Sequence, residues 1–206
     1  EVGSILFNVK SRSVLAQQSF LLPVEINNAE KINNIPAEIT RLPQPLSEAI
    51  KYFESLVRVS SVIVAHNAEF DKKWFGLKKL PQIEKPWICS MDDITWPADR
   101  QLKTRPSVRD LALAYGVPVW NAHRALTDCI YLAEVFIRCS ELEKLLIRAL
   151  EPKVLLRAEI SYEDRYLAKN AGFRWNDAIK GAWSRKMSRR DKEKLDFPVH
   201  EVDFHS

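Results

Sequence analysis

The sequence predicts an α/β chain in which helices flank a mixed sheet, followed by a small α+β domain. The chain opens with two β-rich apolar runs, and short strand-like runs then alternate with segments of helical periodicity. Its 206 residues, 46% of them hydrophobic, are enough for one domain of about 150 residues with about 50 to spare. We therefore predict a domain at 1–151 and a second, smaller one at 152–206.

The first strands predict a β-hairpin, because the apolar runs Glu1–Val9 and Gln18–Val24 are separated by a polar stretch. The chain starts on a strand and without Met, so we expect it to be truncated. Residues 27–45 carry three prolines and predict either a substrate-side loop or an ordinary crossover connection. Further short strands are predicted at 62–65 and 87–91.

Helices are predicted from apolar residues spaced at the helical period at 46–59, 72–79, 107–115 and 123–150. Ser107 is the expected N-cap of the third helix, and Gly116 its C-terminal stop. Pro152 ends the last and longest helix.

Two polar segments that each end on an aspartate carry the candidate chemistry. The run V-I-V-A-H-N-A-E-F-D leads from a buried strand through His66 and Asn67 to Asp71. The segment H-R-A-L-T-D places His123 five positions before Asp128, where the last helix begins. Two carboxylates and one histidine suit hydrolysis of a phosphodiester, since carboxylates bind Mg²⁺ or Mn²⁺ and an imidazole can take a proton from water.

Each of these residues also has a structural interpretation. Asp71 could be a helix N-cap, and His123 could be a polar residue at a helix start. For His66, a hydrogen bond at a strand end is favoured over a substrate contact. The combination of two aspartates with one histidine favours the functional interpretation of Asp71, Asp128 and His123.

The spacing of the cysteines and the length of the apolar runs argue against several classes of protein. The three cysteines form no C-x-x-C pair, which indicates reduced thiols and neither a disulfide framework nor a zinc site. No apolar run approaches the roughly 20 residues of a membrane span, and no signal segment opens the chain. We therefore expect a cytoplasmic protein without a membrane partner.

Three segments carry a resemblance to a known family: A-H-N-A-E-F-D at 65–71, T-R-P-S-V-R-D-L-A-L-A-Y-G-V at 104–117 and N-A-H-R-A-L-T-D at 121–128. They resemble the second and third motifs of the DnaQ-like 3'-5' exonucleases, in the histidine-containing DEDDh branch. The resemblance covers about residues 1–150. It implies a ribonuclease H-like fold and a single-stranded DNA or RNA 3' end as substrate. The family includes the epsilon proofreading subunit of bacterial DNA polymerase III, so a DNA polymerase is a possible partner.

The resemblance also implies roles for individual residues. Asp71 and Asp128 would be metal ligands and His123 the general base. Asn67 and Phe70 would shape the substrate side, where we also count His66 as a candidate. Two Mg²⁺ or Mn²⁺ ions are expected in the complete protein, one activating the attacking water and one stabilising the leaving oxygen.

The sequence departs from the family at its first motif. No Asp-x-Glu occurs in the chain, and Glu1 corresponds to the family's second strand, so it is not assigned to the metal. With two carboxylates we expect at most one weakly held ion. The missing motif favours a second function class, a catalytically inactive nucleic-acid-binding or polymerase-associated module.

The C-terminal segment is basic. Residues 165–192 hold nine Lys and Arg against two Asp and Glu, together with Phe173, Trp175 and Trp183. This mix suits nucleic acid, but it also fits a solvated basic face over a core of aromatic side chains. The pattern A-K-x-A-G-F-R-W followed by K-G-A-W is similar to a small uncharacterised module of bacterial and phage proteins.

Overall fold

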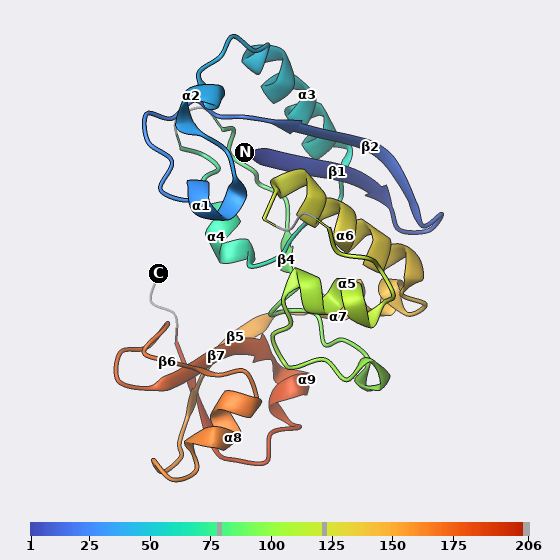
Figure 1. Ribbon diagram of the computed structural model, residues 1–206. Helices are drawn as coiled ribbons and strands as arrows, with labels where there is room; N and C mark the ends of the chain where they lie inside the picture. The colour runs from blue at the N-terminus through green and yellow to red at the C-terminus, as the bar shows by residue number, and fades with distance from the viewer. Residues whose placement is uncertain (78–79, 121–122, 204–206) are drawn as a thin grey trace.

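The computed structural model describes residues 1–77, 80–120 and 123–203, and the chain divides into a larger N-terminal and a smaller C-terminal part (Figure 1). The N-terminal part combines strands and helices, as the sequence predicts. Its strands are β1 (Val2–Asn8), β2 (Ser13–Phe20), β3 (Ile63–Ala65) and β4 (Trp87–Cys89). Its helices are α1 (Glu30–Asn33), α2 (Ala37–Thr40), α3 (Leu46–Val59), α4 (Ala68–Lys72), the 3-10 turn Ala98–Arg100, α5 (Val108–Ala114), α6 (Ala125–Arg138) and α7 (Leu142–Ala149).

Strands β1 and β2 form the predicted hairpin, but the turn comes earlier than expected. Pairing runs from Val2 opposite Phe20 to Asn8 opposite Ser13, so β2 includes residues that the sequence placed in the connection. Arg12 has a positive φ of 54° in the turn. Its guanidinium donates to the carbonyl oxygens of Phe136 and Cys139 at 3.0 and 2.8 Å, which ties the turn to the end of α6.

The prediction of one helix from about His123 to Leu150 is wrong in its middle. Helix α6 ends at Arg138, Cys139 is extended, and α7 starts at Leu142. No glycine or proline marks the break. The hydrogen bonds from Arg12 satisfy carbonyl groups that a continuing helix would need for its own amides, so a residue distant in the sequence helps to end α6.

Strands β3 and β4 pair in parallel, with Val64 opposite Ile88. Within the described residues this pair and the hairpin are two separate two-stranded sheets. The single mixed sheet of a ribonuclease H-like fold therefore stays a prediction. Helix α4, which was expected at 72–79, begins directly after β3 and ends at Lys72, while residues 78–79 lie outside the described part.

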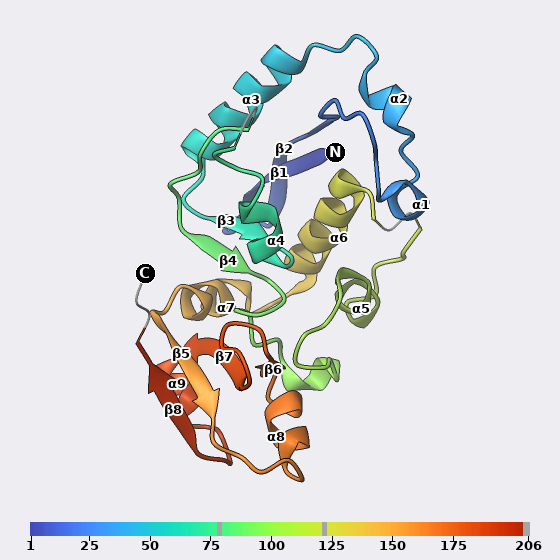
Figure 2. The same ribbon diagram turned by 90° about the vertical axis from the view of Figure 1, so that its left-hand side faces the viewer.

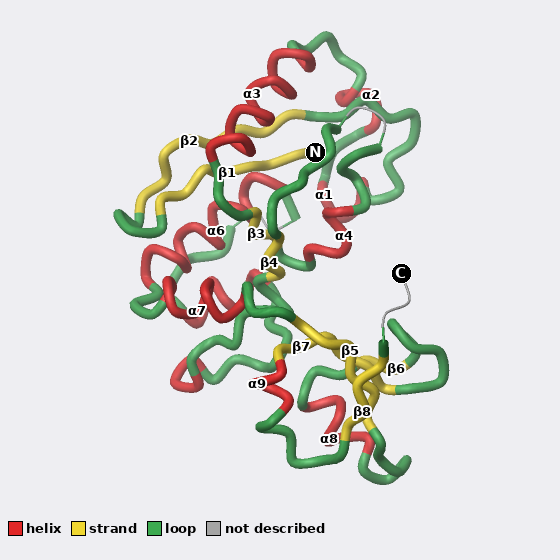
Figure 3. Tube along the Cα trace, turned by 180° about the vertical axis from the view of Figure 1, so that it is seen from behind, coloured by secondary structure: helices red, strands yellow, loops and turns green. Residues whose placement is uncertain are grey.

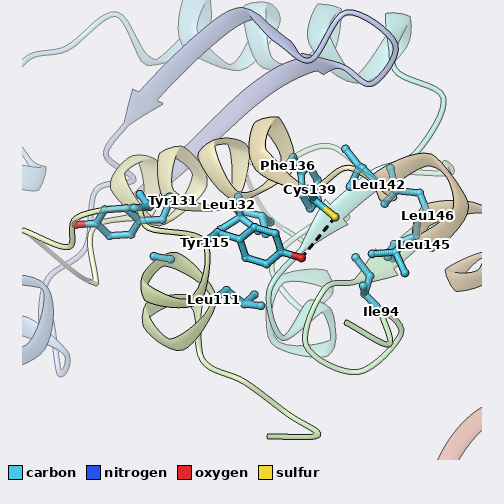
Figure 4. Packing of buried hydrophobic residues seen from close by; sticks show 14 of the residues in the cluster. Ile94, Leu111, Tyr115, Tyr131, Leu132, Phe136, Cys139, Leu142, Leu145 and Leu146 are labelled. Carbon is cyan, nitrogen blue, oxygen red and sulfur yellow. Dashed lines mark hydrogen bonds between the residues drawn. The ribbon is translucent and has the colours of Figure 1, made fainter. Parts of the chain in front are cut away.

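The main core lies between α5, α6, α7 and β4. Figure 4 shows Tyr115 pointing across this core towards Cys139, whose sulfur accepts a hydrogen bond from the tyrosine hydroxyl at 3.5 Å. The predicted capping of α5 is confirmed, because Ser107 accepts from the Asp110 amide and Gly116 has a φ of +67°. The fully buried members of this core include Ile88, Leu111, Tyr131, Val135 and Leu142.

A second cluster joins α3 to the hairpin through Phe20, Phe53 and Leu80. The predicted helix at 46–59 is confirmed with the same bounds. The predicted connection 27–45 contains the one-turn helices α1 and α2. Within the described residues, no helix is long and apolar enough to span a membrane.

The C-terminal module, residues 153–203, has its own sheet in the order β6-β7-β5-β8. Its small core is formed by residues such as Leu156, Phe173 and Met187 and is covered by Ala168 of α8. Figure 2 shows α8 and the sheet as a unit below α7. The elements are β5 (Lys153–Ala158), α8 (Arg165–Asn170), β6 (Arg174–Trp175), β7 (Trp183–Ser188), α9 (Arg189–Lys192) and β8 (Val199–Val202).

The loop after β4 joins the two parts of the chain. The Asp92 carboxylate accepts two hydrogen bonds from Arg105, of which the Nη2–Oδ2 bond is 3.1 Å long. The main-chain oxygen of Asp92 accepts from Arg185 of β7 at 3.4 Å. Asp93 pairs with Lys153, the first residue of β5, at 2.9 Å. The loop thus joins the module to the N-terminal part through the main-chain oxygen of Asp92 and the carboxylate of Asp93.

Candidate active site

Asp71 lies on α4, where the chain turns sharply out of β3. Asn67 precedes the helix with a φ of +71°, a left-handed conformation that asparagine tolerates better than most residues. Its carbonyl oxygen accepts from the Phe70 amide at 2.8 Å, and the Ala68 amide donates to the Cys89 sulfur at 3.4 Å. These bonds hold α4 against the end of β4. Asp71 is inside the helix, so its alternative interpretation as an N-cap does not hold.

The Asp71 carboxyl group is half-buried and its charge is uncompensated. Burial raises its pKa to about 6, although its own backbone amide opposes the shift. Within residues 1–77, 80–120 and 123–203, no ion pair reaches this carboxylate. A carboxylate that costs free energy to ionise would be stabilised by a cation.

Asp128 lies in the first turn of α6, at the other side of the site. Its Oδ1 accepts from the backbone amide of His123 at 3.3 Å. Burial raises its pKa, while this hydrogen bond and the nearby His123 charge lower it by less. His123 is exposed and has a φ of +68°, outside the start of α6. The predicted pair is therefore in contact through the main chain, and the imidazole remains exposed to solvent.

Glu1 is fully engaged in holding the start of α6. Its side chain is 7% exposed and pairs with Arg124 through two hydrogen bonds of 3.0 and 3.2 Å. It also accepts from the Ala125 amide at 2.8 Å, at the helix N-terminus. Figure 2 shows the start of β1 beside this end of α6. The carboxylate is thus already satisfied, in agreement with leaving Glu1 out of the metal ligands.

The charges of three acidic groups act on the Cys129 thiol. Burial raises the pKa of its thiol to about 12, with further contributions from the charges of Asp71, Asp128 and Glu1. The thiol donates to the Gly3 carbonyl oxygen at 3.5 Å. A Cβ at Gly3 would come within 2.3 Å of the Leu126 nitrogen, so glycine permits this close approach of β1 and α6. The sequence indicated Cys129 only as one of three reduced thiols.

The carboxylates at the site are of the chemical type that binds a divalent cation, but they are few. Asp71 and Asp128 are half-buried carboxylates with no ion pair in the part of the chain that the structure describes, and carboxylate oxygens are the donors that Mg²⁺ or Mn²⁺ prefers. However, no group of three or more His, Cys, Asp or Glu residues that could hold a metal occurs in the described part of the chain. Asp71 and Asp128 therefore fit as a partial ligand set, and two ions would need further donors.

The other predicted residues surround α4. The His66 Nδ1 lies 3.0 Å from the Ser90 hydroxyl, and burial lowers the pKa of His66 to about 4. This geometry is that of a structural hydrogen bond at the end of β3. Phe70 is 56% exposed, and its ring packs edge-on against Trp74, which is also 56% exposed, with centroids 6.2 Å apart. Trp74 was not among the predicted site residues, and it lies in the turn that follows α4.

Comparisons with known proteins give partial matches. Residues 154–202 match a domain of unknown function (DUF8626). The chain is 32% identical over 130 residues to a protein named DNA polymerase III PolC-type from Thermotoga petrophila, and equally to that of Thermotoga maritima. The match covers 58% of this chain but only 9% of each relative. No solved structure matches. The chain is thus distantly similar to a part of proteins named DNA polymerase III PolC-type.

Proposed function

We propose that this chain is a metal-dependent 3'-5' exonuclease of the proofreading or repair type, which releases mononucleotides from DNA or RNA. The observation that carries this proposal is that Asp71 and Asp128 are both half-buried carboxyl groups for which the described residues offer no ion pair, and that the charges of both raise the pKa of the Cys129 thiol. The similarity to PolC-type polymerases supports a role in DNA replication and a polymerase as partner.

The two aspartates would hold the metal. A bound Mg²⁺ or Mn²⁺ supplies Lewis-acid polarisation of the phosphate and makes the attacking water more acidic. Asp71 and Asp128 come from α4 and α6, so their spacing depends on how these helices pack, and the close contact at Gly3 fixes α6 against β1. The raised pKa of both carboxyl groups means that their ionisation and cation binding would be coupled.

His123 would accept the proton of the attacking water. Its backbone is held by the hydrogen bond to Asp128, and the residue is exposed, whereas His66 is partly buried with its ring nitrogen near the Ser90 hydroxyl. A general base must reach the proton that it takes, and an exposed side chain on a tight turn can do so. The Asp128 carboxylate would stabilise the imidazolium that results.

Phe70 and Trp74 would contact the bases at the strand end. Both rings are exposed within one turn of Asp71, and stacking of a base on an aromatic ring contributes about 1–3 kcal/mol. Asn67, at the start of the same helix, would help to shape the substrate side of the site.

A catalytically inactive binding module is the second candidate function. It is favoured by the engagement of Glu1 with Arg124 and Ala125, which leaves two carboxylates for the metal in the described residues. Such a module would still contact a strand end through Phe70 and Trp74 but would release no nucleotide.

Release of mononucleotides from a 5'-labelled single strand separates these candidates. We expect shortening from the 3' end that requires Mg²⁺ or Mn²⁺ and stops in EDTA. His123→Gln should slow it by about 100-fold or more, the usual contribution of a general base. His200→Gln, at an exposed histidine in the C-terminal module, is the matched control. Strand binding without any metal-dependent shortening would favour the inactive module.

A further inference from the structure

The corner between β3 and α4, which leads to Asp71, is held by the end of β4. The Ser90 amide and hydroxyl both donate to the Ala65 carbonyl oxygen, at 2.8 and 3.3 Å. On the other side of the corner, the Ala68 amide donates to the Cys89 sulfur at 3.4 Å. Ala68 is buried and is the first residue of α4, so Cys89 anchors the start of this helix.

Cys89 is in turn held by the loop that follows β4. Its main-chain amide donates to Asp93 Oδ2 at 2.7 Å, and its carbonyl oxygen accepts from the Asp93 amide at 2.8 Å. The Asp93 side chain is only 14% exposed. Hydrogen bonds to an ionised carboxylate are about twice as strong as those between neutral groups. The Asp93 carboxylate is therefore a strong restraint on the main chain at Cys89.

The other oxygen of the same carboxylate contacts the C-terminal module. Lys153, the first residue of β5, lies 2.9 Å from Asp93 Oδ1. Arg185 of β7 donates to the main-chain oxygen of Asp92 at 3.4 Å. Figure 3 shows the end of β4 beside α4, with strands β5 and β7 of the module below it. The segment that follows β4 is thus bonded to the module, and β4 itself to the helix that carries Asp71.

The module approaches the N-terminal part closely at one further point. Gly172 has a φ of +78°, and a Cβ there would come within 2.8 Å of Thr104 Cγ2 and 3.0 Å of Arg185 Nη1. The Thr104 hydroxyl donates to the carbonyl oxygen of Asn170, the last residue of α8. Arg185 also donates to the Ala171 carbonyl oxygen. A side chain at position 172 would separate these segments, so glycine permits the module to dock in this position.

We propose that Asp93 is a positioning residue of the candidate active site, and that through it the docked C-terminal module sets the position of α4. One oxygen of its carboxylate meets Lys153 of the module, and the other fixes Cys89, whose sulfur holds the start of α4. The catalytic part of this inference rests on the proposed exonuclease function. Displacement of Cys89 would move Asp71 relative to Asp128, and a misplacement of about 1 Å can slow a reaction about 100-fold.

Hydrogen exchange of single amides in the full chain, followed by NMR in EDTA, tests the positioning without any hydrolysis. Asp93→Ala removes the acceptor of the Cys89 amide, so the Ala68 amide should exchange about tenfold faster. Lys153→Gln removes the charged contact from the module and leaves the Asp93 carboxylate in place, so the acceleration should be about threefold. Amides of α3 should keep their wild-type rates, which distinguishes local release of α4 from global unfolding.

Asp93→Asn is the conservative variant. It keeps an oxygen that can accept from the Cys89 amide but loses the charge that meets Lys153. It should therefore recover most of the protection of Ala68 that Asp93→Ala loses, and match Lys153→Gln. A residue that only contributed to overall stability would not give this recovery at α4 with unchanged rates in α3.

Arg190→Gln is the matched control. Arg190 also joins the module to the N-terminal part, through an ion pair of 3.2 Å with Glu151, but this partner follows α7 and not β4. We expect wild-type exchange at Ala68 in this variant. An unchanged Ala68 rate in Asp93→Ala, or an equal acceleration in Arg190→Gln, would overturn the proposal. An unchanged rate in Lys153→Gln would overturn the role of the module.

Nucleotide release in Mg²⁺ is measured separately on the same variants. Asp93→Ala should lower kcat by about 100-fold, and Asp93→Asn and Lys153→Gln by less, in the order of their exchange rates. Wild-type kcat in an Asp93→Ala chain whose Ala68 amide exchanges faster would overturn the catalytic part of the proposal. A wild-type chain that releases no nucleotide would count against the exonuclease, whereas the exchange rates would still decide whether Asp93 positions α4.

Discussion

Two pairs of aspartates in this chain have opposite environments. Asp92 and Asp93, in the loop after β4, are paired with Arg105 and Lys153. Asp71 and Asp128, on α4 and α6, have no cationic partner among the described residues. Burial alone would raise the pKa of Asp92 as it raises that of Asp71, yet the hydrogen bonds and charge of Arg105 hold the Asp92 pKa below its usual range.

The difference between paired and unpaired aspartates distinguishes carboxylates that stabilise the fold from carboxylates that are available for function. A paired carboxylate has its charge compensated within the fold and gives up stability when its partner is removed. An unpaired, half-buried carboxylate destabilises the fold at neutral pH. Such carboxylates are typical of sites that bind a cation or exchange a proton as part of their function. Three single substitutions, with two control substitutions, can test this distinction.

The largest expected effect is on hydrolysis. Asp71→Asn and Asp128→Asn should each reduce metal-dependent nucleotide release to background, because neutral amides are poorer ligands for a divalent cation. Asp177→Asn, which removes a carboxylate from an exposed ion pair of the C-terminal module, should keep the wild-type rate. Nucleotide release is measured with folded protein, as judged by circular dichroism. Wild-type activity in either site variant would end the assignment of that residue.

The next effect is on stability at the loop after β4. Asp92→Asn should lower the free energy of unfolding by about 2–3 kcal/mol, because it leaves Arg105 partly buried without its counter-charge. Urea unfolding at pH 7 measures the change. Asp99→Asn, which removes an exposed partner of Arg100, should change the stability by no more than about 0.5 kcal/mol. Similar values for the two variants would contradict the structural role of Asp92.

The third expected effect is a gain in stability, opposite in sign to the effect of Asp92→Asn. Because the Asp71 pKa is raised from 3.8 to about 6, the folded chain binds more protons than the unfolded chain in this interval. This contribution to stability is present below the unfolded pKa and is lost as pH rises through 6. Asp71→Asn should therefore stabilise the chain by about 2 kcal/mol at pH 8 and have little effect near pH 4. A destabilised variant at pH 8 would mean that Asp71 has a partner in solution.

The smallest effect concerns binding of the cation itself. Mn²⁺ binding, followed by electron paramagnetic resonance, should strengthen by about tenfold between pH 5 and pH 7 as Asp71 ionises. In Asp71→Asn this pH dependence should be largely removed, whereas Asp177→Asn should retain it. Equal pH dependence in the two variants would place the titrating ligand elsewhere.

Where local chemistry decides the structure, the sequence predicted it. Helix α3 and the capped helix α5 follow from apolar spacing, Ser107 and Gly116, all of which act within a few residues. The end of α6 could not be predicted in this way, because it depends on Arg12, more than one hundred residues earlier. Likewise, the count of charged residues in 165–192 could not show that Glu151, which lies outside this range, pairs with Arg190 and compensates its charge.

The candidate site likewise has features that the sequence predicted and features that depend on contacts between distant segments. The motifs identified Asp71, Asp128 and His123 as candidates, and the fold brings the charges of both aspartates to Cys129. The engagement of Glu1 with the start of α6 was not foreseeable from its position, because it requires knowing that β1 and α6 are in contact. His66 could be placed at the end of β3, but its contact with Ser90 depends on β4 lying beside that strand.

The Glu1 carboxylate at the start of α6 has an electrostatic consequence. A helix N-terminus attracts anions, and here an internal anion already occupies that position and also neutralises Arg124. The positive end of α6 is thus unable to draw in a phosphodiester, and the ionised Asp71 and Asp128 repel one. Affinity of the site for a strand end would then depend on the supply of divalent cations, so the concentration of free cation would set how often a strand end is accepted.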